Sequence, residues 1–151
     1  MNYQFPEYVG TGVLNGEDLV FFYYVIGLEK LQGLPFFYDW EAIVLKFENQ
    51  LDIQTCERKS IPTQFADNQI RFTVSSKYDM DNDCEAAAFF RHLRNAFSHY
   101  RIYRDGKWFF FTDENSHSQI TMRGKVEVSL LIEFCCKLID CPENKVANND
   151  I

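Results

Sequence analysis

Side chains that bind phosphate and exchange protons gather in one stretch of the sequence, FFRHLRNAFSHYRIYR, at residues 89–104. The stretch has four arginines, two histidines and no carboxylate, although the whole chain has a formal net charge of -7. A guanidinium offers a planar fork of donors to phosphate oxygens, and an imidazole exchanges protons near neutral pH. Because an acidic chain repels nucleic acid, this local cluster is where we expect a phosphate-containing ligand to bind.

The same stretch belongs to a predicted helix, residues 84–100, that has two unlike faces. One face is apolar and is expected to pack in the core: Ala86, Phe90, Leu93, Phe97 and Tyr100. The reverse face is polar and holds Arg91, His92, Arg94, Asn95, Ser98 and His99. His and Asn are weaker helix formers than the Lys and Glu of an ordinary solvated face, which indicates a functional surface. The alternative is that His92 and His99 are partly buried and hydrogen-bonded for packing.

Within this helix, the sequence RNAFSH at residues 94–99 resembles the motif of the HEPN superfamily: an arginine, a polar residue, three variable residues and a histidine. Its place in a third helix, followed by a glycine-turn hairpin and a last helix, resembles small stand-alone prokaryotic HEPN proteins. The resemblance covers most of residues 17–140. It implies a metal-independent endoribonuclease that acts on RNA as a homodimer. By position, His99 would transfer protons, Arg94 would bind the scissile phosphate, and Asn95 would orient the site.

The spacing of Arg94 and His99 fits a site shared between two chains. Five residues correspond to about 140° around a helix, so one straight helix does not point both side chains at one atom. If two such helices cross at a twofold axis, the arginine of one chain can approach the histidine of the other. A homodimer is therefore predicted, with His99 of both chains near the axis.

The other polar residues of the region are candidate RNA contacts: Arg91, His92, Ser98, Arg101 and Arg104. In HEPN proteins that pair with a nucleotidyltransferase antitoxin, a tyrosine lies two residues after the histidine, but Arg101 stands there in this chain. The resemblance suggests a toxin or a role in defence against phage, with an antitoxin protein as a further partner. A non-catalytic module that binds RNA, nucleotide or a protein partner is the alternative function.

For the fold class, the sequence predicts a mainly α protein, a four-helix HEPN-like bundle with a small β-hairpin or meander before the last helix. The helices are expected at residues 17–32, 38–54, 84–100 and 129–140, and one short strand at residues 70–75. Asp105 and Gly106 are a strong hairpin signal. Residues 1–141 are expected to form one domain, followed by a flexible tail at residues 142–151. The aromatic run WFFF, residues 108–111, could stack bases, but core packing is the favoured interpretation.

Composition indicates the cytoplasm. Five cysteines without paired CxxC spacing favour a reducing compartment, and the longest apolar run, residues 19–26, is far shorter than a membrane helix. Neither a membrane, a cofactor nor a metal is expected. The acidic residues 79–85 imitate the start of a calcium loop, but Cys84 replaces the glycine that such a loop needs.

Overall fold

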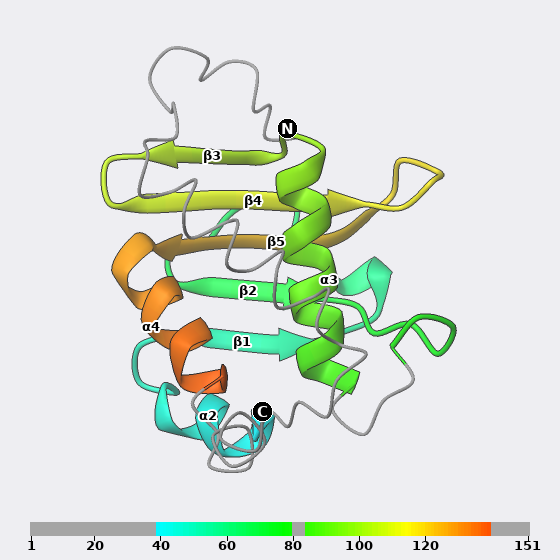
Figure 1. The fold of residues 1–151 in the computed structure, drawn as a ribbon. Coiled ribbons are helices and arrows are strands. Elements are labelled where there is room, and N and C mark those ends of the chain that lie inside the picture. The colour runs from blue at the N-terminus through cyan, green and yellow to red at the C-terminus, as the bar shows by residue number, and fades with distance from the viewer. Residues whose placement is uncertain (1–38, 80–83, 140–151) are drawn as a thin grey trace, which may run out of the picture.

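The structure is a computed structural model that describes residues 39–79 and 84–139. In these ranges the chain forms a five-stranded sheet, three α-helices and a single 3-10 turn (Figure 1). The elements are α2 (Trp40–Lys46), β1 (Asp52–Thr55), η3 (Arg58–Ser60), β2 (Gln69–Phe72), α3 (Cys84–Ser98), β3 (Ile102–Asp105), β4 (Trp108–Glu114), β5 (Ile120–Glu127) and α4 (Val128–Ile139). The helix predicted at residues 17–32 and the tail predicted at residues 142–151 lie outside the described residues. The single domain at residues 1–141 stays a prediction.

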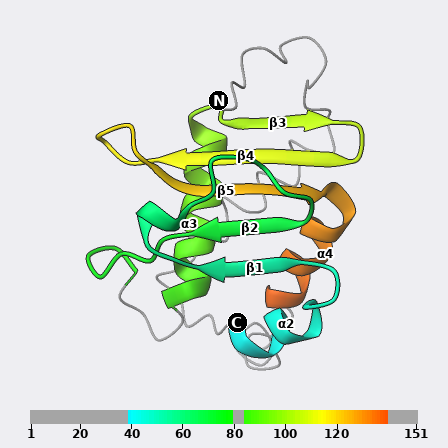
Figure 2. The ribbon, with the colours of Figure 1, turned by 180° about the vertical axis from the view of Figure 1, so that it is seen from behind.

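The strands pair in the order β1-β2-β5-β4-β3. β1 and β2 run parallel, and all other neighbours are antiparallel. Helices α3 and α4 lie on one face of the sheet, and α3 crosses it near the edge where β1, β2 and β4 end (Figure 1). The connection from β1 to β2 passes over the other face (Figure 2). The rings of Phe65, in this connection, and Phe110 of β4 have centroids 5.3 Å apart. The ends of three strands therefore lie beside α3.

Aromatic rings fill the core between the sheet and its helices. Phe72 of β2, Phe89 of α3 and Phe134 of α4 are fully buried. Trp40 of α2 contacts all three, with ring-centroid distances of 5.8, 5.8 and 5.7 Å. Burial of large rings stabilises the fold through the apolar area removed from water and through edge-to-face contacts. This core holds α3 against the sheet along much of the helix.

This architecture corrects the predicted fold class, because the described residues form a mixed α/β fold rather than a mainly α four-helix bundle. The helix predicted at residues 38–54 ends at Lys46. Leu51 continues the apolar stripe of the predicted helix, but it lies in the segment that leads into β1. Its side chain is buried there. Apolar periodicity alone does not separate a helix from a shorter helix followed by a buried strand. β1 and β2 then extend the predicted meander into a five-stranded sheet.

The elements nearest the predicted site agree with the sequence. The helix at residues 84–100 is confirmed as α3, and the last helix is confirmed as α4. The hairpin at Asp105 and Gly106 joins β3 to β4, and Gly106 adopts the left-handed backbone, φ 58°, that glycine accepts readily. The third strand of the meander is β5, and the strand predicted at residues 70–75 is β2.

Candidate functional site

The buried part of the site is a pair formed by His92 and Asp113, which joins the middle of α3 to β4. His92 is 1% exposed, and its Nδ1 lies 2.7 Å from Oδ2 of Asp113. Its Nε2 lies 2.8 Å from the backbone oxygen of Thr73, directly after β2. Because a backbone oxygen only accepts, Nε2 carries a proton, and a second proton lies between Nδ1 and the carboxyl group. Both ring nitrogens are therefore engaged inside the protein.

Neighbouring side chains of α3 extend this network. The amide nitrogen of Asn95 lies 3.4 Å from the same oxygen of Asp113. Arg91 donates from Nε and Nη2 to the two carboxylate oxygens of Asp79, both at 2.9 Å. Asp79 is buried, and its Oδ2 also accepts from the backbone N–H of Ser75 at 2.7 Å. The network fixes the rotation of α3 relative to the sheet and to the loop at residues 73–79.

The structure divides the predicted polar face of α3 into two parts. His92 takes the packing role that the sequence left open as the alternative, and its side chain is in the interior. Ser98 and His99 are exposed, and Asn95 is half-buried. On the predicted apolar face, Tyr100 is 91% exposed, so its expected place in the core is wrong. The accessible part of the predicted site therefore lies at the carboxyl end of α3.

α3 ends at Ser98, and the residues that follow have a backbone arrangement that glycine usually makes. The N–H of Tyr100 bonds to the oxygen of Phe97 at 3.1 Å, and the N–H of Arg101 bonds to the oxygen of Ala96 at 2.7 Å. This is the Schellman pattern of a helix end. Tyr100 adopts φ 57°, a left-handed conformation that costs a non-glycine residue about 1–2 kcal/mol. Strained residues of this kind cluster at functional sites.

Arg94 and His99 leave α3 in different directions. Arg94 is half-buried and follows His92 by two residues, so it starts about 200° further round the helix, on the side away from the sheet. His99 starts about 20° from the direction of His92, and it is exposed because the helix ends there. The geometry of one α3 helix therefore does not point both groups at one phosphate.

The remaining predicted contacts lie beyond the end of α3. Arg101 forms an ion pair with Glu114 of β4, with Nη2 and Oε2 3.2 Å apart. Arg104, on β3, donates from Nε to the backbone oxygen of Gly106 at 3.0 Å and is half-buried. Arg101 lies two residues after His99 in the sequence, whereas Arg104 belongs to the hairpin of β3 and β4.

A comparison with protein families shows to which family this chain belongs. A family model described as HEPN pEK499 p136 matches residues 32–149, a range that includes every described residue and the RNAFSH motif. The chain belongs to this HEPN family. No curated protein and no solved structure matches it. The resemblance seen in residues 94–99 is therefore confirmed at the level of the family.

Sequence reasoning missed the two carboxylates that hold α3 in this HEPN chain, Asp79 and Asp113. Asp113 follows Phe109 and Phe111 at alternate positions of β4, and all three are buried. Alternate residues of a strand share a face, so this spacing places a carboxylate on the core side of the sheet. A carboxylate in such a position needs a buried partner, and the histidine of the neighbouring helix supplies one.

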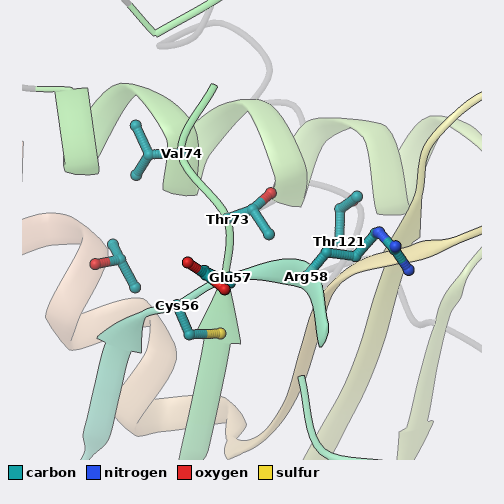
Figure 3. Close-up of a pocket in the computed structure, with 7 residues that line it drawn as sticks. Cys56, Glu57, Arg58, Thr73, Val74 and Thr121 are labelled. Atoms are coloured by element: carbon teal, nitrogen blue, oxygen red, sulfur yellow. The ribbon is translucent and has the colours of Figure 1, made fainter. Parts of the chain in front are cut away.

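A pocket of about 600 Å³ lies beside the buried pair in the HEPN fold. It opens at the carboxyl ends of the parallel strands β1 and β2 and is lined by residues 55–58, Thr73, Val74 and Thr121 (Figure 3). The backbone of Thr73 is the group that accepts from His92. Burial raises the pKa of the Cys56 thiol on its wall, and nearby Arg71 opposes this shift. The pocket was not predicted, since its walls come from segments far apart in sequence.

The described part of the HEPN chain shows neither a metal site nor a membrane-spanning helix. Within residues 39–79 and 84–139, no group of three or more His, Cys, Asp or Glu side chains is arranged to hold a metal ion. Helices in the same ranges are too short or too polar to cross a membrane. Asp79, at the start of the segment that imitates a calcium loop, is bound to Arg91.

Proposed function

We propose that this HEPN protein cleaves RNA at the carboxyl end of α3, with His99 as the proton-transferring residue. One observation carries the proposal, the contrast between two histidines of one helix. His92 has both ring nitrogens hydrogen-bonded in the interior, whereas His99 is exposed at the strained helix end that closes the RNAFSH motif. An exposed imidazole can exchange protons with a ligand near neutral pH.

Cleavage of this kind uses the RNA as its own nucleophile. The 2'-hydroxyl attacks the adjacent phosphorus while the bond from phosphorus to the 5'-oxygen breaks, which leaves a 2',3'-cyclic phosphate and a 5'-hydroxyl. A base accepts the proton of the 2'-hydroxyl, and an acid gives a proton to the leaving 5'-oxygen. Imidazole suits both tasks. Two copies of His99 near a twofold axis would supply one base and one acid.

Arginine has to supply the positive charge at this site. The carboxyl end of a helix carries a partial negative charge and so disfavours a phosphate. A guanidinium can offset that charge and stabilise the phosphorane as it forms. Because Arg94 starts on another side of α3, the Arg94 that reaches a phosphate at His99 would come from a second subunit. The proposed site is therefore complete only in a homodimer.

The test is incubation of purified protein with single-stranded RNA in excess chelator, followed by analysis of the RNA ends. Wild-type protein should leave cyclic phosphate and 5'-hydroxyl ends. His99→Ala should slow cleavage about 10²- to 10⁴-fold, the usual contribution of acid–base catalysis, and should unfold at the wild-type temperature. His117→Ala is the matched control, because His117 is also exposed but lies between β4 and β5. Equal cleavage by wild type, His99→Ala and Arg94→Ala would contradict the proposal.

Subunit mixing tests the shared site. Arg94→Ala and His99→Ala proteins should each be nearly inactive, and a mixture should regain part of the activity once subunits exchange. In a mixed dimer, one half-site keeps both Arg94 and His99. Sedimentation at several concentrations checks the dimer itself. A strictly monomeric protein that still cuts RNA would exclude the shared site.

A non-catalytic HEPN module that binds RNA, nucleotide or a protein is the second candidate. The ion pairs of Arg91 with Asp79 and of Arg101 with Glu114 favour it, because they reduce the positive charge available to a transition state. Salt-sensitive RNA binding without cleavage of any RNA would support this module. A toxin or defence role, with an antitoxin as partner, stays a prediction from the resemblance.

A further inference from the structure

An exposed aromatic ring lies beside the polar side of α3. The described residues have four exposed large apolar side chains, Leu45, Val74, Tyr78 and Tyr100. Tyr78, in the loop before α3, is 64% exposed, and its ring is next to the cationic side chains of Lys77 and Arg91. An exposed ring beside cations is a feature of surfaces that bind single-stranded nucleic acid.

Tyr78 is held in place although most of its ring faces solvent. The guanidinium carbon of Arg91 lies 5.6 Å from the ring centroid, and Nζ of Lys77 lies 5.2 Å from it. Arg91 is itself fixed by two hydrogen bonds to the buried carboxylate of Asp79. A ring held between two cations is already ordered, so a ligand that stacks on it loses less conformational entropy.

A polar side of α3 leads from the Arg91 that contacts Tyr78 to the proposed reactive residue. Arg91, Asn95 and Ser98 follow at spacings of four and three residues, so they lie on one side of α3, and His99 is next to them. From Arg91 to His99 is eight residues, or about 12 Å along the helix axis.

We propose that Tyr78 stacks a base of a single-stranded RNA that lies along this side of α3 and brings its backbone to His99. The inference rests on the proposed function, since it names how the substrate is held. Any base has a flat face that can stack on tyrosine, and Nζ of Lys77, beside the Tyr78 ring, can pair with a phosphate of the strand. The carboxylates of Asp79 and Glu114 are already paired with Arg91 and Arg101.

The experiment measures the affinity for a short fluorescent single-stranded RNA by anisotropy, in a His99→Ala background that leaves the RNA uncut. Tyr78→Ala should weaken binding about five- to hundredfold, the usual effect of removing one stacked base. Tyr78→Phe keeps the ring and should bind as the background does. Leu45→Ala is the matched control, because Leu45 is also 64% exposed but lies on α2.

Three results would overturn the inference. One is unchanged affinity in Tyr78→Ala, and another is a loss in Tyr78→Phe as large as in Tyr78→Ala. A loss in Trp108→Ala without one in Tyr78→Ala would also overturn it, because Trp108 lies on β4, on the face of the sheet that α3 does not cover. Cleavage is measured separately in proteins that keep His99. If wild type binds RNA through Tyr78 but never cuts it, the proposed function fails while the binding surface stands.

Discussion

His92 lies within α3 and His99 directly follows its last residue, seven residues further on, and their surroundings are opposite. His92 sits in the interior with a carboxylate on one ring nitrogen and a backbone oxygen on the other. His99 is exposed, and it lies where the helix turns into a strained residue, Tyr100. A buried histidine that is fully hydrogen-bonded serves the fold, because neither nitrogen can reach a ligand. An exposed histidine at a helix end is available for chemistry.

The comparison shows how a small protein can fix the position of an exposed side chain at the end of a helix. The buried network fixes the rotation of α3 through contacts made two turns before that end. A rotation of α3 by one residue would move His99 by about 100° around the helix axis. The stability of the buried part therefore sets the geometry of the exposed part.

The largest effect on stability should come from breaking the buried pair. Asp113→Ala leaves His92 without its carboxylate and should cost about 3–5 kcal/mol of unfolding free energy. Urea unfolding measures this change. Asp67→Ala is the control, because Asp67 pairs with Lys125 at the surface, where an ion pair contributes about 0–1 kcal/mol. Equal costs for the two variants would show that the His92 pair does not hold α3.

A smaller change in stability, of opposite sign, is expected at the exposed carboxyl end of α3. Tyr100→Gly removes the left-handed strain and should stabilise the fold by about 0.5–1 kcal/mol, after the larger chain entropy of glycine is subtracted. Urea unfolding measures the change. Ser118→Gly is the matched control, because Ser118 has φ 59° in the loop between β4 and β5. It should stabilise the protein similarly, and a loss of stability in Tyr100→Gly would contradict the account.

The smallest effect concerns a surface pair on β1 and β2. A hydrogen bond from Arg71 holds the pKa of Asp52 below its ordinary value. The pair therefore stabilises the fold above the ordinary pKa, and this contribution is lost as pH falls through the lowered value. Asp52→Asn should cost less than about 1 kcal/mol at neutral pH and nothing in strong acid. Urea unfolding at several acidic pH values tests this. If the stability cost of Asp52→Asn grows toward low pH, the pKa of Asp52 is not lowered by Arg71.

Local patterns made the helix and hairpin around the site predictable. The apolar spacing of residues 84–100 identified α3, and Asp105 with Gly106 identified the turn between β3 and β4. Both depend on residues that are close in sequence. The RNAFSH motif likewise indicated the family, because its residues are close together in the sequence.

Contacts between distant segments were not predictable in the same way. β1 and β2 have four residues each. No sequence pattern near Ile53 or Ile70 indicates that these two residues pair. The sequence left open whether His92 is buried, because its partners, Thr73 and Asp113, are 19 and 21 residues away. Helical spacing fixes which residues share a side of α3, but only the sheet decides which side is buried.

The division of labour between the two histidines is tested most directly by measuring RNA cleavage and thermal unfolding on the same preparations of wild type, His92→Gln and His99→Gln. We expect His99→Gln to keep the wild-type Tm and lose cleavage. His92→Gln should lower the Tm by about 3–10 °C and cleave at a rate close to wild type while folded. The account is contradicted if folded His92→Gln has lost cleavage while His99→Gln cleaves normally.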